Sequence, residues 1–138
     1  VNTMYGDIWY VPTNDLLQAK LIDDAKGNYI FKNKIGENSL SLTFEEVYTA
    51  GKSANYWINV TNVNSLAEMK ASYPNYEWFD AFKKGNVYAY NKRMNAKGSN
   101  DYFEQGILRP DIILNDLGKI FYPNLFPTYD LYFYQQLK

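Results

Sequence analysis

NVYAYNKRMNAKGSNDYFEQGILRPDIILNDLGKIF, residues Asn86–Phe121, is the stretch that decides the predicted fold of this chain. Its first residues, Asn86–Tyr90, follow the Lys84-Gly85 break and predict a strand. The polar loop Asn91–Asn100 comes next. Loops that join a strand to a helix usually have about 2–6 residues, so a loop of about ten favours a functional role. In open α/β sheets such loops gather at the carboxyl ends of strands, where ligands bind, so this loop predicts a ligand site.

The second half of the same stretch predicts two helices. Asn100-Asp101 is a helix-start signal, and Glu104 stands three residues after Asp101, which is the spacing of a capping box. Pro110 interrupts this helix but is tolerated in the first turn of a new one. Apolar residues three and four positions apart then mark one buried face: Ile113, Leu114, Leu117, Ile120 and Phe121.

The composition excludes several classes of function. With 138 residues the chain is long enough for one domain, and its net charge of −1 gives no electrostatic basis for binding nucleic acid. It has no Cys and no His, so we expect no catalytic triad, no metal site and no cofactor. It is rich in rings, with 14 Tyr, 8 Phe and 3 Trp. Many of these must be core, but several lie on polar, turn-rich stretches typical of ligand-binding rings.

Strand and helix signals alternate along the rest of the chain. Strands are predicted at Met4–Val11, Tyr29–Phe31, Tyr56–Val60 and Leu131–Tyr134, and helices at Asp15–Ala25, Thr43–Gly51, Ser65–Ala71 and Tyr76–Lys83. This alternation predicts a three-layer α/β fold, with helices flanking a mainly parallel sheet of four or five strands. With no linker and no internal repeat, residues 1–138 are predicted to form a single domain.

No stretch approaches the ~20 apolar residues of a membrane-spanning helix, and no signal peptide is visible. The chain begins with Val1-Asn2 rather than Met, so we expect a processed or truncated piece of a longer protein.

Three parts of the chain together carry a resemblance to a known family. Leu21–Phe31, LIDDAKGNYIF, is similar to a "helix, A-G-G, short strand" element, with Lys26 in place of the first Gly. Leu42–Tyr48 followed by Ala54–Ile58 resembles an "S-x-E-x-[VIL] … A-D-hydrophobic" pattern, with Asn55 where Asp is common. The third part has an x-V-Y strand and a final helix, at Asn86–Tyr88, Asn100–Glu104 and Arg109–Asp111.

These parts resemble the C-terminal lobe of the substrate-binding proteins of ABC importers for iron–siderophore, haem and cobalamin (class III periplasmic binding proteins), in a Tyr- and Asn-rich style similar to that of Bacteroidetes-type bacteria. Members have two α/β lobes joined by a long helix, with the ligand in the cleft between them. The resemblance covers nearly the whole chain but only about half of a family protein. The N-terminal lobe and the connecting helix are therefore expected to lie outside it.

The resemblance implies a function without catalysis. The chain is expected to capture a metal chelate or macrocycle, namely an iron–siderophore, haem or a corrinoid, and to deliver it to the membrane subunits of an ABC permease. It implies a monomer in the periplasm or at the cell surface, with a lipid anchor in the full-length protein.

The resemblance for the strand ends, together with the chemistry of the long loop and of the helix start that follows it, predicts a set of ligand-binding residues: Trp9, Tyr10, Asn59, Tyr90, Asn91, Arg93, Asn95 and Tyr102. Rings would stack on the ligand, and the Arg93 guanidinium would grip a carboxylate or an anionic chelate. Structural alternatives stay open. Trp9 is equally well explained as a core residue under the first helix, and Arg93 as a solvated loop charge.

Glu45 is predicted to contact the permease. Thr43 and Glu46 have the spacing of a second capping box, which leaves Glu45 facing solvent. In the family, one exposed Glu at the start of a helix on each lobe docks against permease arginines, and the resemblance assigns this role to Glu45. The alternative is that Glu45 only favours the helix N-terminus through the helix dipole.

Two other functions remain open. Asp101 and Glu104, one turn apart on a helix, could form the acid/base pair of a small α/β hydrolase or glycan-processing enzyme, although a capping box explains the same spacing. Exposed Tyr and Trp also suit a carbohydrate-binding module, but such modules are commonly β-sandwiches, and strand–helix alternation counts against one.

Overall fold

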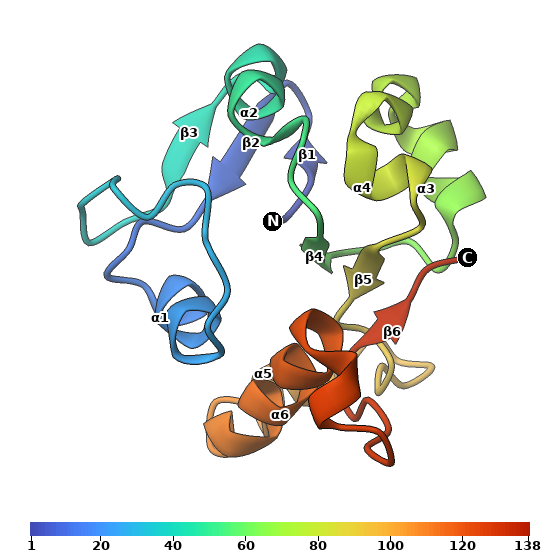
Figure 1. Ribbon diagram of the computed structural model, residues 1–138. Coiled ribbons are helices and arrows are strands. Elements are labelled where there is room, and N and C mark those ends of the chain that lie inside the picture. Colours follow the sequence, from blue (N-terminus) through green and yellow to red (C-terminus); the bar gives the residue numbers. More distant parts are fainter.

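The computed structural model describes all residues from Val1 to Lys138 and shows a mixed α/β fold (Figure 1). The strands are β1 (Met4–Tyr5), β2 (Ile8–Val11), β3 (Leu40–Leu42), β4 (Trp57–Val60), β5 (Val87–Ala89) and β6 (Gln135–Gln136). The helices are α1 (Leu17–Asp24), α2 (Phe44–Gly51), α3 (Leu66–Ser72), α4 (Asp80–Lys83), α5 (Asp101–Glu104) and α6 (Pro110–Phe121), with 3₁₀ turns η1 (Pro74–Trp78) and η2 (Pro123–Leu125). No helix combines the length and apolarity that crossing a membrane requires.

The strands form two three-stranded sheets rather than one. β1, β2 and β3 pair antiparallel, whereas β4 pairs parallel with β5 and β5 pairs antiparallel with β6. The backbone N–H of Asn2 donates to the carbonyl of Ile58 at 3.0 Å, so the start of the chain reaches β4 of the second sheet. In Figure 1 the first sheet, α1 and α2 lie on one side of the molecule, and α3 to α6 surround the second sheet on the other.

The predicted mainly parallel sheet of four or five strands is not seen, because only one of the four strand pairings is parallel. Met4–Val11, predicted as one strand, is a hairpin that turns at Gly6, whose φ of +60° suits glycine. Tyr29–Phe31, also predicted as a strand, is irregular and lacks a neighbouring strand. The last strand begins at Gln135 rather than at Leu131.

The core is aromatic where the two sheets meet. The Trp9 and Trp57 rings stack with their centroids 5.5 Å apart, and Phe79 and Tyr76 lie 4.9 and 5.1 Å from Trp57. Each indole N–H is satisfied, since Trp9 donates to the carbonyl of Val1 and Trp57 to that of Asn2. The ring cluster therefore joins the hairpin, β4 and η1 through both burial and hydrogen bonds.

The α2 capping box is confirmed. The Thr43 hydroxyl accepts from the N–H of Glu46 at 3.2 Å, and the Glu46 carboxylate accepts from the N–H of Thr43 at 2.8 Å. The predicted box at Asp101 and Glu104 is not formed. Asn100 is the N-cap instead, and its side-chain oxygen accepts from the N–H of Tyr102 at 3.1 Å.

Candidate ligand-binding site

The carboxyl end of β4 departs from regular strand geometry. Asn59 has a φ of +60° inside the strand, and Asn62, two residues past its end, has a φ of +61°. Few residues other than glycine adopt this left-handed conformation, and Asn is among those that tolerate it best. The Asn59 side chain is buried and accepts from the Tyr134 hydroxyl at 2.6 Å. The buried Asn59 side chain thus stabilises the conformation of the strand end and does not present its amide to solvent.

Asn91 ties together three chain segments at the end of β5. Its amide group donates to the carbonyl of Val63 and to the side-chain oxygen of Asn64, both at 3.1 Å. Its own side-chain oxygen accepts from the Gln135 amide at 2.7 Å. Asn91 is buried, so it holds the loops at the ends of β4 and β5 in register beside β6.

A cluster of buried tyrosines lies beneath these loops. The rings of Tyr90 and Tyr102 stack with centroids 4.5 Å apart, and Tyr134 stands edge-on to Tyr102 at 5.8 Å. Burial raises the pKa of Tyr90 to about 12, and burial also raises the pKa values of Tyr102 and Tyr134. An ordinary tyrosine is already neutral at physiological pH, and burial disfavours the phenolate forms of these three further.

Arg93 is the cation that the structure presents at this end of the sheet. It is exposed, its Nε–H donates to the carbonyl of Tyr132 at 3.2 Å, and its Cζ atom lies 3.5 Å from the centre of the Tyr132 ring. The neighbouring Lys92 ammonium donates to the carbonyl of Leu131. Stacking on the ring orients the guanidinium, and its terminal N–H groups have no protein partner.

Asn95 shapes the turn that follows Arg93. Its side-chain oxygen accepts from the N–H groups of Lys97 and Ser99 at 2.9 and 3.0 Å. Asn95 is exposed, so its amide nitrogen remains accessible beside the Arg93 loop.

The two predicted residues of β2 point in opposite directions. Trp9 is 1% exposed and belongs to the core, whereas Tyr10 is 41% exposed on the outer face of the hairpin. On that face Ile8 pairs with Tyr5, which is 81% exposed and was not among the predicted ligand-binding residues. Side chains alternate between the two faces of a strand. If the turn at Gly6 had been predicted, this alternation would have placed Tyr5 on the exposed face of the hairpin. No hydrogen bond or cation–π contact joins these rings to Arg93, which follows β5 of the other sheet.

Glu45 is exposed in the first turn of α2 and takes part in no hydrogen bond or salt bridge, because the cap uses Thr43 and Glu46. Asp101 and Glu104 lie on the four-residue helix α5, half-buried and exposed respectively, and neither side chain contacts a hydroxyl that could serve as a nucleophile. No cluster of three or more His, Cys, Asp or Glu side chains is placed to hold a metal ion.

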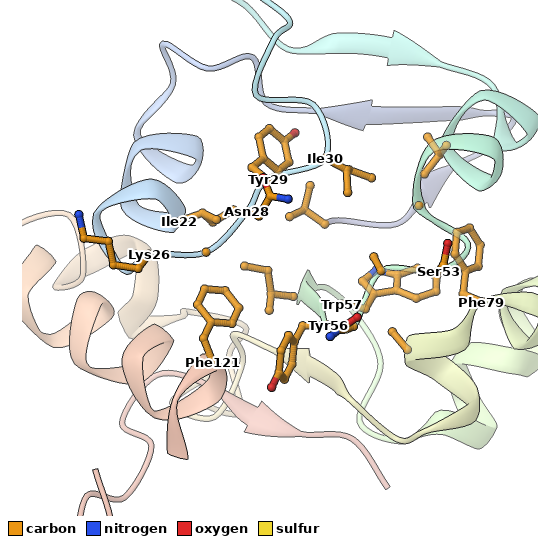
Figure 2. Close-up of a pocket in the computed structure, with 18 of the residues that line it drawn as sticks. Ile22, Lys26, Asn28, Tyr29, Ile30, Ser53, Tyr56, Trp57, Phe79 and Phe121 are labelled. Atoms are coloured by element: carbon orange, nitrogen blue, oxygen red, sulfur yellow. The ribbon is translucent and has the colours of Figure 1, made fainter. Parts of the chain in front are cut away.

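A mostly apolar cavity lies away from the residues at the carboxyl ends of β4 and β5. Its volume is about 570 Å³, and it opens between Lys26–Ile30 and Ser53–Ile58, with Phe121 and Val47 in its mostly apolar wall (Figure 2). Trp9 is the one predicted ligand-binding residue that lines it. Val1 also lines it.

Comparison with known proteins gives one informative match. No protein-family model matches the chain. No solved structure gives a significant match. The chain is 31% identical over 133 residues to an uncharacterized lipoprotein of Methanocaldococcus jannaschii. The match covers 94% of this chain but 30% of the relative, so the chain spans less than a third of that protein.

Proposed function

We propose that this chain is one lobe of an extracytoplasmic substrate-binding protein that delivers a metal chelate or macrocycle to an ABC importer. The main observation behind the proposal is the polar surface at the adjacent ends of β4 and β5. There Asn91 connects two loops by hydrogen bonds, and Arg93 is oriented by stacking on the Tyr132 ring. The carboxyl ends of parallel strands are where α/β proteins bind ligands. The sequence resemblance to such lobes is the second support.

Arg93 determines the kind of ligand that we expect. Its terminal N–H groups form a planar fork that matches a carboxylate or another anionic oxygen pair. Because the guanidinium is already held by a hydrogen bond and a ring, little side-chain freedom is lost on binding. A ligand with anionic oxygen atoms at its edge, such as a ferric siderophore or haem with its propionates, suits this site.

The ligand would carry its own chelator. The chain has no His and no Cys, and burial raises the pKa values of Tyr90 and Tyr102 next to the site, which disfavours their phenolate forms further. Asn59, Tyr90, Asn91 and Tyr102 then support the site as buried residues, while Arg93 and Asn95 contact the ligand directly. Tyr10 is exposed on β2 of the other sheet, so we do not place it in contact with the same ligand. In a two-lobe protein, closure of the second lobe would desolvate the ligand.

The binding test is a titration of the full-length protein with ferric siderophores, haem and corrinoids. Arg93→Ala is expected to weaken binding of the anionic ligand at least about tenfold, since a charged hydrogen-bonded pair contributes about 1.5–3 kcal/mol. Arg93→Lys should recover only part of the loss, because an ammonium cannot form the paired contact.

Lys97→Ala is the matched control, because Lys97 is an exposed cation of the same loop whose ammonium group forms no hydrogen bond or salt bridge. The proposal fails if no chelate or macrocycle binds, or if Arg93→Ala and Lys97→Ala weaken binding equally.

Glu45 is proposed as the permease contact. It is a carboxylate without a partner at the exposed start of α2, positioned by the Thr43–Glu46 cap. Glu45→Arg in the full-length protein is expected to abolish ligand uptake by cells while leaving ligand affinity unchanged, because like charges would then meet at the contact. The matched control is Glu37→Arg, in an exposed loop. Normal uptake with Glu45→Arg would reject this role.

We also propose that the full-length protein is lipid-anchored outside the cytoplasm, as the name of the archaeal lipoprotein indicates for that relative. Labelling of the full-length protein by a metabolic fatty-acid probe, with recovery in the membrane fraction, is the expected result. An unlabelled protein recovered in the soluble fraction would contradict the anchor without touching the binding test.

A further inference from the structure

Trp78 differs from the other two tryptophans of the chain in its surroundings. Trp9 and Trp57 are buried, and each of their indole N–H groups donates to a backbone carbonyl. Trp78 is 45% exposed at the end of η1, and no hydrogen bond within the protein uses its indole N–H. Exposed tryptophans are enriched at protein interfaces, because the ring buries apolar area while its N–H finds a partner. Trp78 is therefore a candidate contact residue.

The exposed Trp78 ring is held in place by the rings next to it. It stands edge-on to Phe44 and to Tyr48, with centroids 6.0 Å apart in both pairs. Phe44 and Tyr48 stack on each other at 5.9 Å. The carbonyl of Lys52, which follows α2, accepts from the N–H of Asp80 at 2.9 Å, so the segment after Trp78 is also attached to this helix. Because the ring is already ordered, little side-chain freedom is lost when a partner binds.

Helix geometry places Glu45 on the side of α2 that Trp78 contacts. Successive helical residues are about 100° apart, so Glu45 and Tyr48 project within about 60° of each other, whereas Glu46 projects from the opposite side. The Trp78 ring packs on Phe44 and Tyr48, so it lies beside the first turn of α2, which carries Glu45. The Glu45 carboxylate and the Trp78 ring therefore share one exposed surface.

The charges of this surface favour a cationic partner. Glu77, next to Trp78, is paired with Lys70 at 2.6 Å, and the Glu46 carboxylate accepts from the N–H of the helix cap. Glu45 has neither a salt bridge nor a hydrogen bond. A free carboxylate beside an exposed aromatic ring suits an arginine side chain, whose N–H groups pair with the carboxylate while its flat face stacks on the ring.

We propose that Glu45 and Trp78 form one recognition site for an arginine side chain of the permease, in which Glu45 pairs with the guanidinium and the Trp78 ring stacks on it. The inference rests on the importer role proposed for the chain and adds a second contact residue to the Glu45 surface. Arg93, stacked with its Cζ atom 3.5 Å from the centre of the Tyr132 ring, shows the same stacking within the chain. The site selects arginine over lysine, because an ammonium lacks the flat face and the paired N–H groups.

Binding of the labelled full-length protein to membrane vesicles tests the site. The vesicles are prepared from source cells that retain the permease and lack the endogenous binding protein. Trp78→Leu keeps apolar bulk but removes the aromatic face, so it is expected to weaken binding about five- to thirtyfold. Trp78→Phe should recover part of the loss, because a phenyl ring also attracts a cation. Tyr5→Leu is the matched control and should bind like the parent, since Tyr5 is an 81% exposed ring on β1 rather than beside α2.

A double-mutant cycle in the same assay tests whether the two side chains contact one arginine. Glu45→Gln combined with Trp78→Leu should weaken binding less than the product of the two single effects, because either change displaces the shared guanidinium. Independent effects, or binding of Trp78→Leu equal to that of the parent, would overturn this inference and leave the docking role of Glu45 intact. Unchanged vesicle binding of Glu45→Arg would reject the docking role and this inference together. Weaker ligand binding by Trp78→Leu in the titration would indicate a general change in the fold and also count against the site.

Discussion

Lys26 follows α1 in a left-handed backbone conformation, with a φ of +60°. This conformation costs an L-residue about 1–2 kcal/mol, whereas glycine adopts it freely but loses more entropy on folding. The two effects partly cancel, so Lys26→Gly is expected to raise the free energy of unfolding by about 0.5–1 kcal/mol. The Lys26 carbonyl, which accepts from the Tyr122 hydroxyl at 2.7 Å, is retained in the variant. Denaturant unfolding measures the change.

Lys34→Gly is the control for this prediction. Lys34 is another exposed lysine in an irregular segment, but its φ is not positive, so glycine only adds freedom to the unfolded chain. Lys34→Gly should leave stability unchanged or lower it. Equal effects of the two substitutions would show that the left-handed backbone at Lys26 is not strained.

At the scale of elements, Asp116 attaches the C-terminal segment to α6. Its buried carboxylate accepts from the N–H groups of Tyr132, Phe133 and Tyr134 at 2.7–3.2 Å and from the Tyr129 hydroxyl at 2.7 Å. Removing it leaves several buried donors without an acceptor. Asp116→Ala is therefore expected to lower the free energy of unfolding by about 3 kcal/mol or more. The same segment carries the Tyr132 ring under Arg93, so the tie also positions the ligand site.

Asp111→Ala separates this effect from the general loss of a carboxylate on α6. Asp111 is exposed and pairs with Arg109 at 2.9 Å, and exposed pairs contribute at most about 1 kcal/mol. If chemical denaturation gave the same loss for both variants, the buried acceptor role of Asp116 would be refuted.

At the scale of the whole molecule, the many buried tyrosines make stability sensitive to alkaline pH. Burial raises the pKa of Tyr76 and of Tyr90 to about 12, whereas the unfolded value is about 10. The folded state therefore binds these protons more tightly. Their contribution to stability is complete below about pH 10 and is lost as pH rises toward 12.

Tyr90→Phe tests this dependence, because no hydrogen bond uses the Tyr90 hydroxyl and the ring stacking on Tyr102 is kept. At pH 11, which is about one unit above the unfolded pKa, the variant should have lost about 1 kcal/mol less stability than the parent. Denaturant unfolding at pH 8 and pH 11 makes the comparison. Identical losses in the two proteins would contradict the assignment.

The elements that could be predicted from sequence are those stabilised locally. The Thr43–Glu46 cap and the apolar face of α6 depend on residues within one or two helical turns, and both are present. β5 also lies within the predicted Asn86–Tyr90. Tyr29–Phe31, predicted as a strand, runs into a turn instead, in which the Tyr29 carbonyl accepts from the N–H of Lys32 at 3.1 Å, so β propensity alone does not make it a strand.

The residues of the candidate site were likewise predictable from the sequence only in part. Sequence reasoning selected the loop after β5 because of its length and polarity, and the structure orients Arg93 there. It could not show that Trp9 and Asn91 are buried whereas Tyr10 and Asn95 are exposed, because burial depends on which residues pack against each side chain.

By itself, the sequence determined the mixed α/β character, the helix starts at Thr43 and Ser65 and the absence of His and Cys, because these follow from residue types and short spacings. Only the tertiary structure decided how the strands divide into two sheets, which aromatic rings are buried, and that Tyr132 and Asp116 hold the Arg93 surface. These contacts join residues 16 or more positions apart, whose pairing depends on long-range packing that no local pattern encodes.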